Sequence, residues 1–130
     1  MTKIPDSHVD LLERPILFNL ATIQPDGQPQ LTPVWGDYKG GVLRINTAAG
    51  RQKYKNLVAR PQATILVVDP DNDQRYMEIR GRVVERIEPD NEVIDKLAHD
   101  YLGVDKYPYY VDGEVRVTFH IQPERVTTSG

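Results

Sequence analysis

Tight turns between short alternating segments constrain this chain most. The turn motifs at 25–27 (Pro-Asp-Gly) and 39–41 (Lys-Gly-Gly) separate runs in which apolar and polar residues alternate. Proline fixes φ, and glycine adopts the left-handed backbone that a tight turn requires. Segments 17–23, 29–38 and 42–47 are therefore expected to pair as consecutive antiparallel hairpins.

The rest of the chain continues this pattern with few helical interruptions. The expected strands are residues 17–23, 29–38, 42–47, 63–69, 75–88 and 114–122. Apolar residues at helical spacing predict short helices over 5–13, 50–60 and 89–102, the last ending at Gly103. Pro33 requires a sheet edge or a bulge, and Gly81 marks a bend or bulge.

Six antiparallel strands with a few short helices predict a mainly β fold. A β-sandwich is the alternative. We favour a closed or nearly closed six-stranded barrel, because an open sheet of this size leaves two exposed edges.

Length and composition are those of one ordinary domain spanning residues 1–130. The chain has no cysteine, which fits a cytoplasmic protein and excludes thiolate metal sites. No apolar run approaches about 20 residues and the N-terminus has no apolar core, so neither a membrane span nor a signal peptide is expected. The net charge of −3 argues against a general nucleic-acid binder.

One segment departs from this acidic background. Residues 51–60 carry four cations and no acid. On a helix, Tyr54 belongs to the buried stripe, while Arg51 and Lys53 flank that stripe in the first turn. Both reach the space beyond the helix N-terminus, where the backbone N–H groups already favour an anion. The patch is therefore either a phosphate site or an ordinary solvated helix face.

Four stretches carry a family resemblance: LATIQPDGQPQLTPVW (20–35), INTAAGRQKYKNLVARPQATILV (45–67), RYMEIRGRVV (75–84) and the closing YLG…VRVTFHIQPERV. In this order they resemble the pyridoxamine-5′-phosphate-oxidase-like, FMN-binding split-barrel superfamily. Within it they are most similar to the deazaflavin-dependent oxidoreductases that use coenzyme F420. The resemblance implies a split β-barrel homodimer with two cofactor sites at the subunit interface.

The resemblance also implies roles for particular residues. Arg51 and Lys53 would hold the cofactor phosphate, and Asn46 and Thr47 would line its ribityl or phosphate portion. The residues expected beside the ring, mainly through their backbone, are Gln30, Leu31, Thr32, Pro33 and Val34. The partner subunit's Tyr76 and the partner subunit's Met77 are expected near the closed pocket.

The function implied is hydride transfer between the reduced deazaflavin and a small organic substrate. FMN is the alternative cofactor, and the alternative functions are a non-catalytic flavin carrier and a structural interaction domain. Tyr109, Tyr110 and His120 are candidate proton donors by residue type alone. Residues 69–73 resemble the start of a calcium loop, but its required glycine and glutamate are missing, so no metal site is predicted.

Overall fold

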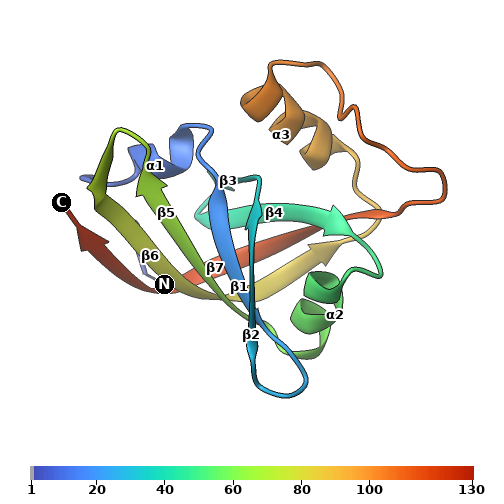
Figure 1. The fold of residues 1–130 in the computed structure, drawn as a ribbon, viewed down its shortest axis with the longest axis horizontal. Coiled ribbons are helices and arrows are strands. Elements are labelled where there is room, and N and C mark those ends of the chain that lie inside the picture. Colours follow the sequence, from blue (N-terminus) through green and yellow to red (C-terminus); the bar gives the residue numbers. More distant parts are fainter. Residues whose placement is uncertain (1) are drawn as a thin grey trace.

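The computed structural model describes residues 2–130 as an antiparallel sheet curled into a half-barrel, with three short helices (Figure 1). The strands are β1 (Phe18–Ile23), β2 (Pro29–Val34), β3 (Gly36–Lys39), β4 (Val42–Ala48), β5 (Gln62–Asp69), β6 (Asn72–Ile87) and β7 (Arg116–Ser129). The helices are α1 (Asp10–Glu13), α2 (Gln52–Ala59) and α3 (Glu92–Leu102). The mainly β, antiparallel prediction is confirmed.

The strand count differs from the prediction: the sheet has seven strands, not six. The segment 29–38, expected as one strand, is two strands interrupted at Trp35. The sheet order is β2-β1-β5-β6-β7-β4-β3, so the two edge strands are neighbours in the chain. Only Trp35 separates these two strands in the chain, so the sheet must curl until its two edges approach each other.

Two residues explain why the chain changes partner strand at this point. Pro33 lies in the edge strand β2 opposite Asn19, a location where a missing backbone N–H is tolerated. Gly36 follows the interruption and pairs with Ile45 of β4. A Cβ at Gly36 would lie 2.3 Å from ring carbons of Phe18, so only glycine fits here.

The core lies inside the curve of the sheet. Buried and partly buried positions alternate along β1 and β5, as period-two side chains of a half-buried strand require. The large side chains that are essentially inaccessible to solvent include Phe18, Leu20, Leu43, Ile45, Ile65, Met77, Phe119 and Ile121.

The long strands β6 and β7 pair with each other in the middle of the sheet. Their pairing register shifts between Arg80 and Gly81, which confirms the irregularity predicted at the glycine. β7 continues to Ser129, beyond the predicted end at residue 122, because it pairs with β6 as far as Tyr76. The first helix is shorter than predicted, since residues 6–9 form turns and only α1 is helical.

Helix α3 packs beside β7 and is tied to β3. The backbone N–H of Gly36 donates to the Tyr101 hydroxyl at 3.2 Å, and Lys96 Nζ lies 2.9 Å from Asp37 Oδ2. The same hydroxyl donates to the carbonyl oxygen of Ile16, just before β1, at 2.6 Å. Gly103 ends the helix as predicted, in the left-handed conformation with φ 73°. These contacts fix the start of the irregular segment 103–115.

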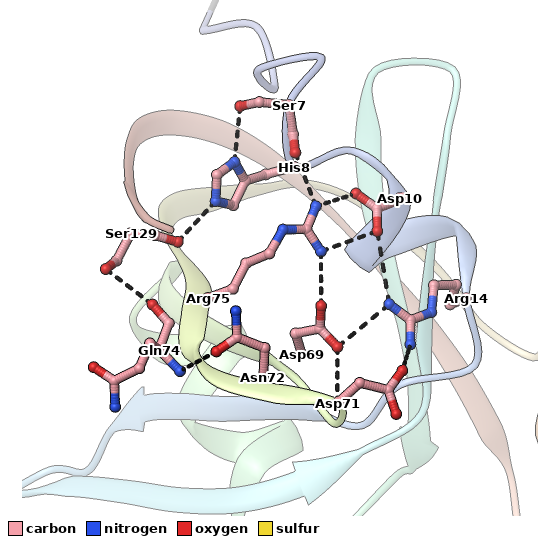
Figure 2. A network of polar contacts seen from close by, with 10 residues as sticks. All are labelled: Ser7, His8, Asp10, Arg14, Asp69, Asp71, Asn72, Gln74, Arg75 and Ser129. Atoms are coloured by element: carbon pink, nitrogen blue, oxygen red, sulfur yellow. Dashed lines mark hydrogen bonds and ion pairs between the residues drawn. The ribbon is translucent and has the colours of Figure 1, made fainter.

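A polar network joins the N-terminal segment to the sheet (Figure 2). The buried ring of His8 donates from Nε2 to the carbonyl oxygen of Ser129 at 2.9 Å, and its Nδ1 lies 2.8 Å from Ser7 Oγ. Arg75 adds a bond to the Ser7 carbonyl oxygen at 2.8 Å. The segment around His8 and the end of β7 are therefore held together.

Arg75 also bridges two carboxylates in this network. Its guanidinium lies 2.5 Å from Asp10 Oδ1 and 2.9 Å from Asp69 Oδ2 (Figure 2). The bond from Arg75 lowers the pKa of Asp10, while the backbone N–H of Asp71 and then Arg75 lower the pKa of Asp69. Both acids therefore stay ionised, and the network is fully paired, which indicates a structural role.

Candidate functional site

A cavity of about 240 Å³ opens where the end of β4 and the start of α2 meet the start of β7. Its remaining walls come from the β2–β3 interruption and from α3 and the segment that follows it. One end is cationic and polar, and the other is mostly aromatic and apolar. Within residues 2–130, no helix is long and apolar enough to span a membrane and no group of three His, Asp or Glu residues could hold a metal.

The cationic end is built around the first turn of α2. Arg51 occupies the N-cap position with extended backbone and provides no side-chain cap. In the part of the chain that the structure describes, no acceptor meets the backbone N–H groups of Gln52, Lys53 or Tyr54. Free N–H groups and the helix dipole together favour an anion at this position.

Arg51 and Lys53 both line the cavity, and neither forms an ion pair with any described residue. Burial lowers the pKa of Lys53, and the neighbouring charges of Arg51 and Arg116 lower it further. Positive charge is therefore concentrated at this end of the cavity, and no described carboxylate forms an ion pair with Lys53 or Arg51. An anionic ligand would relieve that repulsion.

The last residues of β4 supply polar groups to the same end. Thr47 is 3% exposed, and its Oγ1 is buried with no hydrogen-bond partner among residues 2–130. Such an unpaired buried hydroxyl is uncommon in a folded protein, and at this position it is available to a molecule that enters the cavity. The Asn46 amide is paired instead: its Nδ2 donates to Thr118 Oγ1 at 2.9 Å and to the Asp90 carbonyl oxygen at 3.2 Å, and its Oδ1 accepts from Arg116 Nε at 2.9 Å.

Arg116 is a cavity residue that the sequence did not reveal. It is 4% exposed, and the β4–β7 register places it opposite Ala48, directly before the turn into α2. The segment 114–119 alternates polar and apolar residues as any amphipathic strand does. No local signal distinguishes a buried arginine from a solvated one in such a pattern.

The aromatic end is organised around Tyr107. Its ring meets the Trp35 ring edge-on at a centroid distance of 6.0 Å, and the Arg116 guanidinium lies 4.9 Å from its centroid. Its backbone N–H donates to Asp95 Oδ1 at 2.8 Å, which ties the segment to α3. Trp35 in turn stacks on Tyr101 at 5.4 Å. Leu17, Ile94 and Tyr109 complete this end.

The structure brings most of the predicted site residues together. Those lining the cavity are Pro33, Val34, Asn46, Thr47, Arg51 and Lys53. Gln30, Leu31 and Thr32 do not line it but lie farther along the edge strand β2, where Leu31 is 69% exposed. The Met77 side chain is fully buried in the core, whereas Tyr76 is 36% exposed.

The three candidate proton donors differ in position. Tyr109 lines the cavity and is 61% exposed. The Tyr110 hydroxyl donates to Asp95 Oδ1 at 3.1 Å, and burial together with that bond raises the pKa of Tyr110 to about 12. His120 lies outside the cavity, with its Nδ1 3.3 Å from Glu85 Oε1. Only Tyr109 is placed to meet a bound molecule.

Comparisons with known proteins point to one family. The model of the pyridoxamine 5′-phosphate oxidase family matches residues 4–130. A solved structure named F420 reductase is 38% identical with a TM-score of 0.87, covering 95% of this chain and 98% of its own. No curated protein matches the sequence significantly.

Two more distant structures share the fold. A conserved hypothetical protein from Mycobacterium tuberculosis is 25% identical with a TM-score of 0.76, over 99% of this chain and 86% of its own. A putative pyridoxamine 5′-phosphate oxidase from Listeria innocua is 18% identical with a TM-score of 0.69, over 95% of both chains. At that identity the Listeria protein supports the fold alone.

Proposed function

The chain belongs to the pyridoxamine 5′-phosphate oxidase family, and from that premise we propose that it is a deazaflavin-dependent oxidoreductase acting on a small organic substrate. The observation that carries the proposal is the cationic end of the cavity. Arg51 and Lys53 have no carboxylate partner there, and the buried Thr47 hydroxyl has no hydrogen-bond partner among the described residues. A cofactor phosphate would satisfy all three groups.

The residues present fit such a cofactor. Arg51, Lys53 and the free N–H groups of α2 would bind the phosphate, and Thr47 would donate its hydroxyl to it or to the ribityl chain. Pro33 and Val34 would flank the ring where the edge strand β2 leaves backbone groups unpaired. Gln30, Leu31 and Thr32 would continue that contact along β2.

When bound, the reduced deazaflavin supplies a hydride to an electron-poor substrate, which takes its remaining proton from solvent or a nearby hydroxyl. The chain's own contribution is to orient the two rings and exclude water from them. Trp35 and Tyr107 form the apolar wall that does this. Tyr109 is the side chain best placed to deliver the proton, because it lines the cavity and its hydroxyl, unlike that of Tyr110, is not bonded to Asp95.

The cavity of one chain also supports a homodimer. Its volume of about 240 Å³ lies below the roughly 300–1,000 Å³ of pockets that enclose a whole small ligand. Two apolar lining residues, Leu17 at 48% and Tyr109 at 61%, remain exposed on its rim. A second copy of the chain would cover this rim and complete two equivalent sites.

FMN is the second candidate cofactor, because the cationic end suits its phosphate as well. The 38% identical structure named F420 reductase favours the deazaflavin. A non-catalytic carrier would bind either cofactor without turning over a second molecule. A substrate screen with the reduced, protein-bound cofactor separates a carrier from an enzyme.

The deciding experiment is a parallel fluorescence titration of the protein with F420 and with FMN. We expect the deazaflavin to bind more tightly. Replacing both cations, Arg51→Ala with Lys53→Ala, should weaken binding at least about 100-fold, since each charged hydrogen bond contributes roughly 1.5–3 kcal/mol.

The matched control removes two charges elsewhere: Lys39→Ala with Lys55→Ala. Both lysines are exposed and neither lines the cavity, so affinity should be retained. Tighter FMN binding would transfer the proposal to an FMN enzyme. Binding of neither cofactor, or equal affinity in both double variants, would overturn the phosphate site.

A further inference from the structure

One carboxylate is paired with a cation that lines the cavity. The Glu114 side chain is 9% exposed, and its Oε1 lies 3.0 Å from Arg116 Nη1. Arg116 is its only ion-pair partner among residues 2–130. A nearly buried acid next to a site built for an anion opposes that anion, so its presence requires an explanation.

Arg116 is held so that one of its nitrogens stays available. Its Nε donates to Asn46 Oδ1 and its Nη1 to Glu114, while Tyr107 lies against the face of the guanidinium. No described acceptor lies within hydrogen-bond distance of Nη2. Because Arg116 lines the cavity together with Arg51 and Lys53, it can present this free N–H to the same ligand.

The charge of Glu114 acts differently on different phosphates. Repulsion between a fixed carboxylate and a nearby phosphate is proportional to the charge on that phosphate. A phosphate monoester approaches two negative charges above its second pKa of about 6, whereas a diester keeps one. Glu114 therefore opposes a monoester about twice as strongly as a diester.

We propose that Arg116 is the third cation of the anion site and that Glu114 biases this site towards a singly charged phosphate diester over a doubly charged monoester. The inference rests on the proposed function, because it takes the cavity to bind a phosphate-bearing cofactor. The phosphate of F420 is a diester, and that of FMN is a monoester. The Glu114–Arg116 pair is thus a determinant of cofactor specificity.

The test measures dissociation constants for F420 and FMN at pH 7.5 in the wild-type protein and two variants. Glu114→Gln keeps an acceptor for Arg116 but removes the charge, and should lower the ratio Kd(FMN)/Kd(F420) about threefold or more. Arg116→Gln removes a cation and should raise that ratio, because a doubly charged phosphate loses more attraction than a singly charged one. The opposite signs keep the proposal testable when one variant folds poorly.

Two controls separate charge from other effects. Glu114→Asp keeps the carboxylate and should leave the ratio near the wild-type value. Glu124→Gln removes an exposed carboxylate that lies farther along β7 and does not line the cavity, and it should also leave the ratio unchanged. At pH 5.5, where FMN approaches a single charge, the effect of Glu114→Gln on the ratio should shrink.

The outcomes distinguish this inference from the proposed function. Binding of both cofactors with a ratio that Glu114→Gln leaves unchanged, or raises, overturns the specificity role while the phosphate site stands. Binding of neither cofactor to the wild-type protein overturns the proposed function, and the specificity role with it.

Discussion

Replacing Thr47 with valine should make the ligand-free protein more stable and its cofactor complex weaker. Valine has nearly the shape of threonine and lacks only the hydroxyl. That hydroxyl is buried at the cationic end of the cavity and has no hydrogen-bond partner in the described chain. The ligand-free protein therefore buries a polar group without compensation.

The size of the effect on stability follows from that burial. An unpaired buried hydroxyl costs about 1–3 kcal/mol in protein mutational data. The substitution does not affect the pairing of β4 with β7, because Thr47 pairs with Val117 through its backbone. We expect Thr47→Val to raise the free energy of unfolding by about 1 kcal/mol, or the Tm by roughly 4 °C for a domain of this length.

The effect on binding has the opposite sign. A hydrogen bond from Thr47 to a charged phosphate contributes about 1.5–3 kcal/mol, so its loss should weaken cofactor binding about tenfold or more. Urea denaturation of the ligand-free protein measures the first effect. Fluorescence titration with F420 and FMN measures the second.

Thr118→Val is the matched control on the neighbouring strand. Thr118 is fully buried, but its Oγ1 accepts from Asn46 Nδ2 at 2.9 Å, so the same substitution removes a real partner there and should destabilise the protein. If Thr47→Val lowers stability as Thr118→Val does, or leaves cofactor affinity intact, the hydroxyl is not reserved for a ligand and the reasoning fails.

Two further substitutions test the frame of the site. Asp37→Asn removes the negative charge that lies 2.6 Å from Arg44 Nη2 and should cost about 3 kcal/mol in urea denaturation, because the guanidinium charge is left largely buried without a counter-charge. Burial acts to raise the pKa of Asp37, but bonds from Arg44 and Lys96 outweigh it and hold that pKa below 3.8. The stability that this pair contributes is therefore complete above about pH 4 and is lost as the pH falls through the folded-state pKa of Asp37. Asp37→Asn should make the free energy of unfolding depend less on pH in this acid range, and an unchanged dependence would contradict the reasoning. Gly81→Ala places a Cβ 2.6 Å from the Gln122 carbonyl oxygen and should cost about 1–3 kcal/mol, whereas an unchanged Tm would show that β6 and β7 separate freely there.

Local patterns predicted most of the fold. Turn residues and alternation located β1, β4 and β5 to within a residue or two, because each is short and half buried. The count of strands was wrong because Pro33 signals a sheet edge or a bulge, but not that the chain changes partner strand at Trp35. The change of partner strand depends on the close approach of Gly36 to the Phe18 ring, and β3 and β1 come together in this way only once the sheet has curled.

The sequence predicted the site residues that lie close together in the chain, but not the one that strand pairing brings to the cavity. Arg51 and Lys53 occupy one helical turn, so their convergence follows from helical spacing alone. Arg116 reaches the same cavity only through the β4–β7 register, about 65 residues farther along the chain. Thr47 was expected to line the cofactor, but only the fold shows that its hydroxyl has no partner.

The two ends of the cavity rest on different kinds of structure. The cationic end is fixed by sheet pairing and the start of α2, where Asn46 orients Arg116 and the strand backbone orients Thr47. The aromatic end depends on the irregular segment 103–115, which is held to α3 mainly through Asp95. Rigid elements position groups more accurately than loops, and loops change more readily between related proteins. Binding of the phosphate is therefore expected to be a property of the fold, while the choice of substrate resides in the segment around Tyr107.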